Sequence, residues 1–362
     1  MLTLQLVVAS ILITRLTAGV GYRLGLADQP GARKTHNGIV PLTGGIAIFL
    51  TNLFGVVVLE VSPYSYSMLL IACLVFAVGV FDDIRHINPW LRLLIQYGAG
   101  ILLATWGGLA IHDVGNLLGM GNIPLLLLTV PLTALSVAGL SNAYNMIDGI
   151  NGLAAAMITL PLALLYALAL QAGHPMADFL LLMLVPLATF LLFNLGPNNR
   201  LLPRVFLGDG GSVTLGFLVT ASLVYFSQGE NALIMPVTSL WLVTVPLMDM
   251  LATMLRRGMQ GRKLMEADRS HLHHTLMDMG FGTRQTLLLL VSYAVACALL
   301  GRALEALPAY LSLACYILLF LGHCLFVTKA EAIGRRLGRH LPAAVVLVPA
   351  TTESKGRRCE QE

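Results

Sequence analysis

The chain has 362 residues, of which 57% are hydrophobic and only 11% charged, with a formal net charge of +4 and a mean hydropathy of +0.81. Ordinary soluble domains carry roughly a quarter charged residues, so the composition excludes a soluble globular protein and indicates a membrane protein. The five cysteines form no CxxC pair and four of them lie in apolar segments, which favours packing thiols over a metal or redox centre.

Apolar runs of membrane length recur along most of the chain. A spanning helix needs about 20 mostly apolar residues, and the runs predict an all-α, polytopic membrane helical bundle of about eleven transmembrane helices. An integral membrane domain is expected over residues 1–328, and a basic cytoplasmic tail over residues 329–362. The first run lacks a basic segment and a cleavage site, so it is expected to be a retained span. The expected helices lie near residues 1–20, 42–61, 67–81, 91–111, 122–141, 152–171, 178–195, 212–227, 232–253, 285–301 and 306–328.

The distribution of Lys and Arg predicts the orientation of the bundle, because these residues concentrate in short cytoplasmic loops. If the N-terminus lies outside, then of the 22 basic residues only Arg15 and Arg302 fall outside the cytoplasmic loops, helix ends and tail. We therefore expect a periplasmic N-terminus and a cytoplasmic C-terminus. The acidic and histidine clusters described next then all lie on the cytoplasmic side.

Asp82 and Asp83 stand together at the end of the third predicted helix. Two adjacent carboxylates at a membrane boundary repel one another and are costly to desolvate unless a cation compensates them, which favours a bound Mg²⁺. The alternative is a pair that is solvated in the loop or neutralised by Arg85. Taken alone, the pair leaves both interpretations open.

The segment NAYNMIDGINGLA (residues 142–154) follows the fifth predicted helix. Asn142, Asn145 and Asp148 recur every three residues, so on a helical turn they share one face, and the glycines allow a ligand to approach the backbone. Capping of the helix end would explain one or two of these polar residues but not the whole stripe. We therefore expect a ligand-facing surface.

Asp209 lies in VFLGDGGSVTLGF (residues 205–217), where glycines flank it just before a predicted helix. Glycines at a helix N-terminus are typical of anion binding, and a carboxylate suits the Mg²⁺ that accompanies a diphosphate. GDGGS is also a good turn and N-cap in its own right. The prediction depends on three acidic clusters sharing one side of the membrane.

The longest predicted cytoplasmic loop contains DRSHLHH (residues 268–274), preceded by several arginines that include Arg257. His271, His273 and His274 could bind zinc, but structural zinc sites prefer four N or S ligands and no cysteine lies nearby. We expect instead that imidazoles and guanidinium groups surround diphosphate oxygens. The concentration of Lys and Arg in cytoplasmic loops by itself explains most of the arginines.

The first predicted cytoplasmic loop, DQPGARKTHNGIVPLTGG (residues 28–45), offers Arg33, Lys34 and His36 as a second phosphate-contacting segment. Topology and loop flexibility explain these residues nearly as well. Taken together, carboxylates for a metal and cations for a diphosphate describe phosphoryl transfer, which needs little help from a protein nucleophile. A site confined to one membrane face implies that one substrate is a lipid.

In these motifs the chain resembles the polyprenyl-phosphate N-acetylhexosamine 1-phosphate transferases, and within them the WecA-type bacterial enzymes that use UDP-N-acetylglucosamine and undecaprenyl phosphate. The matches are Asp82-Asp83, NAYNMIDGINGLA, VFLGDGGS, the VPLMDM run at 245–250 and DRSHLHH. The resemblance implies Mg²⁺-dependent transfer from a UDP-N-acetylhexosamine, with release of UMP, at the cytoplasmic face of a bacterial inner membrane. It also implies initiation of lipid-linked surface polysaccharide such as O-antigen, a homodimer, Mn²⁺ as a substitute for Mg²⁺, and no nucleic-acid partner.

The resemblance also assigns roles to residues. Asp209 resembles the direct Mg²⁺ ligand, with Asp83 as a second metal contact. Asp82 resembles the group that accepts a proton from the lipid phosphate. One departure is that Asn151 stands where the bacterial pattern DGxDG has a second Asp, which favours hydrogen bonding through its amide over acid–base work. The expected catalytic residues are Asp82, Asp83, Asp148 and His271, and the expected substrate-binding residues are Arg33, Lys34, His36, Asn142, Asn145, Asn151, Arg257, His273 and His274.

A transporter of a nucleotide-sugar or of a polyprenyl lipid is the alternative from another class. Transporters typically place polar sites at the membrane midplane on broken helices, whereas the acids here lie at one face. Among enzymes, the GxGD pattern of intramembrane aspartyl proteases would need glycine at Phe206. The pattern of CDP-alcohol transferases would need an Arg and further acids after Asp148, which this chain lacks.

Overall fold

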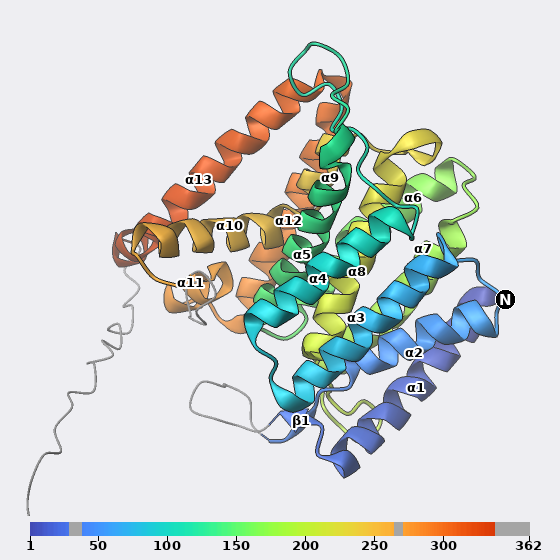
Figure 1. Cartoon of the computed structure of the whole chain (residues 1–362). Coiled ribbons are helices and arrows are strands. Elements are labelled where there is room, and N and C mark those ends of the chain that lie inside the picture. Colours follow the sequence, from blue (N-terminus) through green and yellow to red (C-terminus); the bar gives the residue numbers. More distant parts are fainter. Residues whose placement is uncertain (29–37, 264–270, 337–362) are drawn as a thin grey trace, which may run out of the picture.

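The computed structural model describes residues 1–28, 38–263 and 271–336, with side chains as far as Ala330. This part of the chain is a helical bundle that includes a two-stranded antiparallel ribbon, β1 (Ala27–Asp28) paired with β2 (Val40–Pro41) (Figure 1). The helices are α1 (Leu2–Leu24), α2 (Gly44–Val57), α3 (Tyr66–Arg85), α4 (Pro89–Thr105), α5 (Thr129–Ile147), α6 (Leu153–Gln171), α7 (Ala177–Leu195), α8 (Gly208–Ser227), α9 (Pro236–Leu242), α10 (Thr244–Met259), α11 (Leu272–Asp278), α12 (Thr283–Ala303) and α13 (Ala309–Arg336), with short 3-10 turns at Leu126–Leu128, Gly229–Asn231 and Leu304–Ala306.

Within the described ranges, eight helices are long and apolar enough to cross a membrane, or nine if α9 and α10 cross as one broken span. The chain is therefore a multi-pass helical membrane protein, as the composition predicts. Each of the eleven predicted segments overlaps a helix, but α2 has only 14 residues. At 1.5 Å per residue such a helix covers about 21 Å, less than the hydrocarbon core of a bilayer. The total of eleven spans stays a prediction.

The prediction of one helix over residues 232–253 is wrong. The structure divides this segment into α9 and α10, whose axes differ by 80° (Figure 1). The break follows Leu242, four residues before Pro246. A proline ring clashes with the carbonyl group four residues earlier and provides no N–H, so a straight helix through this point is disfavoured. As a result α10 runs across the bundle.

α8 is the central helix, and nearly all of its residues are buried between α2, α3, α5 and α6. Glycines allow the close packing. A Cβ on Gly210 would lie 2.9 Å from the backbone nitrogen of Val80 in α3, and a Cβ on Gly211 would lie 2.7 Å from the Cα of Gly45 in α2. The glycines of GDGGS therefore bring α2 and α3 against the start of α8, a packing role that the sequence interpretation had not included.

A tight connection links α3 to α4 at the same end of the bundle. His86, the residue that follows α3, lies in the left-handed region (φ 51°), and the Asn88 side chain accepts a hydrogen bond from the backbone N–H of Trp90 while Pro89 begins α4. This geometry places the first turn of α4 beside the last turn of α3. The end of α5 and the start of α8 lie at this end as well (Figure 1).

Candidate active site

Arg92 joins two acidic residues that are far apart in the sequence. Asp82 is 3% exposed, and its Oδ2 accepts a hydrogen bond from Arg92 Nη1 at 2.9 Å, while its Oδ1 accepts one from the backbone N–H of Ile87 at 2.6 Å. The same Nη1 donates to Asp209 Oδ2 at 3.1 Å. The cation beside the acidic pair is therefore Arg92 of α4, where the sequence had offered Arg85.

Asp83 caps the first turn of α8. Its Oδ1 accepts the backbone N–H of Asp209 at 2.8 Å, and its Oδ2 accepts that of Gly210 at 3.0 Å. A carboxylate at a helix N-terminus satisfies N–H groups that have no partner within the helix and interacts favourably with the helix dipole. The N–H groups that the sequence offered to a substrate anion are therefore bonded to Asp83 in this structure.

Asn145 bonds the carboxylate oxygen of Asp209 that Arg92 does not. Its Nδ2 donates to Asp209 Oδ1 at 2.8 Å and lies 3.0 Å from Ser212 Oγ. Asn142, one turn earlier on α5, is buried, and its Nδ2 lies 3.2 Å from Met146 Sδ. The polar stripe predicted on α5 therefore reaches the acidic cluster through Asn145, whereas the contact of Asn142 lies on its own helix.

Asp148 follows the last residue of α5 and reaches solvent. The surrounding protein atoms raise the pKa of Asp148 above the usual range of a carboxyl group, and the negative charges of Asp209 and Asp83 act in the same direction. Carboxylates with such a pKa are frequent where a group must exchange a proton near neutral pH. Four acidic side chains therefore share this end of the bundle.

The histidine segment is fastened to α10 by Asp249. The Nδ1 of His271 lies 3.0 Å from Asp249 Oδ2, and the backbone N–H of Leu272 donates to Asp249 Oδ1 at 2.7 Å. Asp249 belongs to the VPLMDM run, one of the motifs by which the chain resembles the transferase family. The resemblance gives Asp249 no role.

His273 places the histidine segment beside the α5–α6 turn. Its ring packs directly on Gly149, so closely that a Cβ there would overlap the imidazole. The rings of His273 and His274 lie 4.2 Å apart. Arg257 is buried near the end of α10, and Asn151 is half-buried in the turn after Gly149. These contacts bring three of the sequence motifs together.

Several expected site residues lie outside the described residues. They are Arg33, Lys34 and His36 of the first loop, together with the first three residues of DRSHLHH, so their part in the site stays a prediction.

The acidic cluster fits Mg²⁺ only as a partly solvated ion. The described residues contain no group of three or more His, Cys, Asp or Glu side chains arranged to hold a metal. Mg²⁺, however, usually keeps several waters and binds through one or two carboxylates and substrate phosphates. Asp209 suits such binding because its side chain is 42% exposed, compared with 4% for Asp82. Both oxygens of Asp83 already accept backbone hydrogen bonds, so a metal contact there would use its remaining lone pairs.

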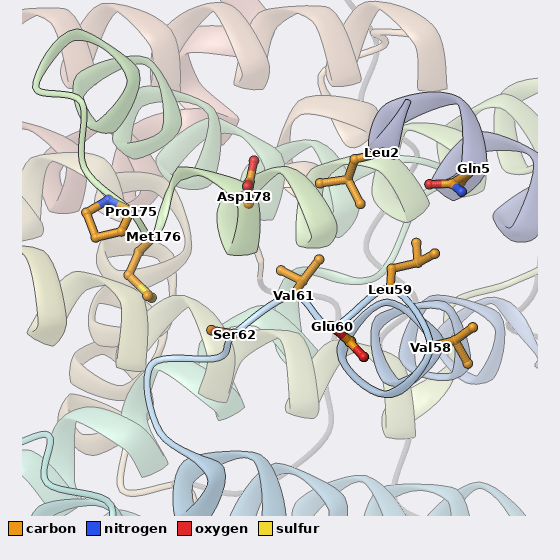
Figure 2. A pocket seen from close by; sticks show the side chains of 10 residues that line it. All are labelled: Leu2, Gln5, Val58, Leu59, Glu60, Val61, Ser62, Pro175, Met176 and Asp178. Carbon is orange, nitrogen blue, oxygen red and sulfur yellow. The ribbon is translucent and has the colours of Figure 1, made fainter.

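A cavity of about 560 Å³ lies at the opposite end of the bundle, between the starts of α1 and α7 and the segment after α2 (Figure 2). Polar side chains in its lining come from Gln5, Glu60, Ser62 and Asp178. The motifs of the acidic cluster are absent from its lining, so it is separate from the candidate active site.

Comparison with known proteins agrees with the motifs. The glycosyl transferase family 4 model matches residues 65–227, which run from the start of α3 to the end of α8. An undecaprenyl-phosphate alpha-N-acetylglucosaminyl 1-phosphate transferase from Yersinia pestis is 34% identical over 327 residues, which cover 88% of this chain and 89% of the relative. The protein of the same name from Escherichia coli strain K12 is 33% identical over 88% of each chain, and that from Pasteurella multocida is 32% identical over 88% of this chain and 91% of its own. The resemblance predicted from the motifs is confirmed, and the chain is a transferase that belongs to glycosyl transferase family 4.

Proposed function

We propose that the chain transfers N-acetylglucosamine 1-phosphate, or a related N-acetylhexosamine 1-phosphate, from its UDP-sugar to undecaprenyl phosphate and releases UMP. The observation that carries the proposal is the position of Asp209, which Asn145 and Arg92 hold beside Asp82 at one end of a membrane bundle. A carboxylate and a guanidinium group held this way can bind a metal-associated diphosphate next to a lipid phosphate. The names of the relatives support the acceptor and the sugar.

The reaction joins an oxygen of the lipid phosphate to the β-phosphorus of the UDP-sugar. The bond between the β-phosphorus and the bridging oxygen breaks, and UMP leaves with that oxygen. Phosphoryl transfer of this kind depends mainly on positioning and on compensation of negative charge. Arg92 is placed to compensate charge, and Asn145 to orient the carboxylate of Asp209. His273 packs on Gly149, the residue after Asp148, and contact with the donor is proposed for His271, His273 and Arg257.

Two residues are candidates for accepting the proton of the lipid phosphate, Asp82 and Asp148. Asp82, the residue favoured by resemblance, is buried and already bonded to Arg92 and to a backbone N–H. Asp148 reaches solvent, and its pKa is raised above the usual range of a carboxyl group. Solvent access therefore favours Asp148 for the proton, with Asp82 positioning Arg92.

Mg²⁺, or Mn²⁺ in its place, is the proposed cofactor, with Asp209 as its protein ligand and Asp83 as a second candidate contact. Such an ion supplies compensation of the negative charge that develops on the diphosphate. The proposed setting is a bacterial inner membrane with the acidic cluster at the cytoplasmic face. The charge distribution of the loops supports this orientation.

The test is purified protein incubated with radiolabelled UDP-N-acetylglucosamine, undecaprenyl phosphate and Mg²⁺. Label in the lipid fraction together with an equal amount of UMP supports the proposal. If neither forms, the transfer is excluded, and uptake of labelled donor into sealed vesicles would then favour a transporter. A panel of UDP-sugars assayed for UMP release identifies the sugar.

A further inference from the structure

Asp249 of α10 has a buried carboxylate, and the two groups that face its oxygens belong to the start of α11. The residue is 2% exposed, with Oδ2 facing His271 Nδ1 at 3.0 Å and Oδ1 accepting the N–H of Leu272 at 2.7 Å. A buried carboxylate is costly unless hydrogen bonds compensate it. One side chain thus holds both the backbone at the start of α11 and the ring of the preceding histidine.

The contact also determines where the ring carries its hydrogen. A carboxylate can only accept hydrogen bonds, so the hydrogen between the two groups belongs to Nδ1 of His271. Nε2 is then the ring nitrogen left to act on a ligand. This arrangement differs from a ring that is merely packed, because it selects one of the two tautomers.

The position of α11 connects this pair to the acidic cluster. The rings of His271 and His273 are nearly parallel, with centroids 6.0 Å apart and an interplanar angle of 5°. His273 packs on Gly149, the residue that follows Asp148. A displacement of α11 would therefore move the histidines away from the residues that surround Asp209.

We propose that Asp249 is a positioning residue that holds His271 in the Nδ1–H form, so that Nε2 can accept a hydrogen bond from a hydroxyl or amide N–H of the donor. The identity of the ligand as the UDP-sugar donor rests on the proposed function, whereas the hydrogen-bond assignment rests on the contacts of Asp249. Asp249 acts through His271 and does not contact the reacting atoms.

Nitrogen NMR of histidine-labelled protein tests the assignment without any assay of activity. The variant Asp249→Asn can still accept the N–H of Leu272 through its Oδ1, while its Nδ2 donates to the ring. The hydrogen on His271 should therefore leave Nδ1 in this variant and occupy Nε2. His271→Gln identifies the resonances. The matched control is His323→Gln, because His323 of α13 also lies within electrostatic range of Asp249 and its loss should leave His271 unchanged.

Two spectroscopic results would overturn the inference. The first is an Nδ1 without hydrogen in the wild type, which decides the matter even if Asp249→Asn does not fold. The second is an Nδ1 in the same state in the wild type and in a folded Asp249→Asn variant.

A double-mutant cycle then tests the role in transfer. Asp249→Asn and His271→Gln should each lower turnover about 10- to 100-fold, as loss of groups that orient a functional histidine typically does. Because both changes remove the same function, the double variant should be no slower than the slower single variant. Losses that multiply would overturn the positioning role. A wild type with no turnover would refute the proposed function, and the NMR result would still decide the hydrogen-bond assignment.

Discussion

At the scale of single residues, the acidic cluster is held together by Arg92. Sequence reasoning placed Asp82, Asp209 and Asn145 in one site, and the structure brings them together. Sequence reasoning did not assign Arg92 to the site, because membrane topology fully explains a basic residue at a cytoplasmic helix end. Asp249 was missed for a related reason, since a single acid in an apolar run gives no spacing pattern to interpret.

Loss of either carboxylate bonded to Arg92 should stop transfer. Asp209→Asn and Asp82→Asn are each expected to lower turnover at least about 100-fold, because preorganised electrostatic groups contribute effects of that size. The matched control is Asp178→Asn in the first turn of α7, which lines the cavity at the opposite end of the bundle. Both site variants should still insert into the membrane and, after extraction in detergent, elute from size-exclusion chromatography as folded protein. Wild-type turnover in either would refute the site.

Removal of Arg92 should make stability depend more strongly on Mg²⁺. Arg92→Gln leaves buried Asp82 without its cation, which typically costs about 3 kcal/mol of unfolding free energy. A divalent ion can compensate part of that charge, so Mg²⁺ should raise the unfolding temperature of Arg92→Gln more than that of the wild type. Arg85→Gln, an exposed arginine at the same end, is the control. Equal Mg²⁺ effects in Arg92→Gln and wild type would argue against a metal at this cluster.

At the scale of helices, the existence and order of the elements follow from apolar runs, whereas their breaks and contacts do not. The run over residues 232–253 is predominantly apolar, so hydropathy could not reveal the break between α9 and α10, although Pro246 was a local signal. The glycines of GDGGS indicated a ligand site. Their use in packing α8 against α2 and α3 depends on helices distant in sequence, which a single sequence does not identify.

The packing of α3 on α8 predicts different outcomes for two Gly→Ala changes. A Cβ on Gly79 would lie 2.5 Å from the Cα of Gly210, so Gly79→Ala should push the helices apart and cost about 1–3 kcal/mol of stability. Turnover should fall too, because Asp83 caps α8 across this contact. Gly98 has nothing within 4 Å of its Cβ position, so Gly98→Ala should be neutral or stabilising. Thermal unfolding in detergent measures both, and equal stabilities would contradict the packing account.

At the scale of the whole molecule, orientation is the main prediction that the fold leaves open. With the native cysteines replaced, Arg85→Cys marks the end that holds the acidic cluster, and Gln171→Cys, at the end of α6, marks the other. A thiol reagent that cannot cross membranes should label Gln171→Cys in intact cells and Arg85→Cys only after permeabilisation. The reverse pattern would place the acidic cluster outside.

The central claim is that a sugar 1-phosphate, and not the sugar alone, moves to the lipid. UDP-N-acetylglucosamine labelled with ³²P in the β-phosphate distinguishes the two reactions in one incubation with undecaprenyl phosphate. The account predicts that the ³²P appears in the lipid fraction while unlabelled UMP is released. Recovery of the label as water-soluble UDP would mean that the phosphoryl bond stays intact, and it would contradict the account.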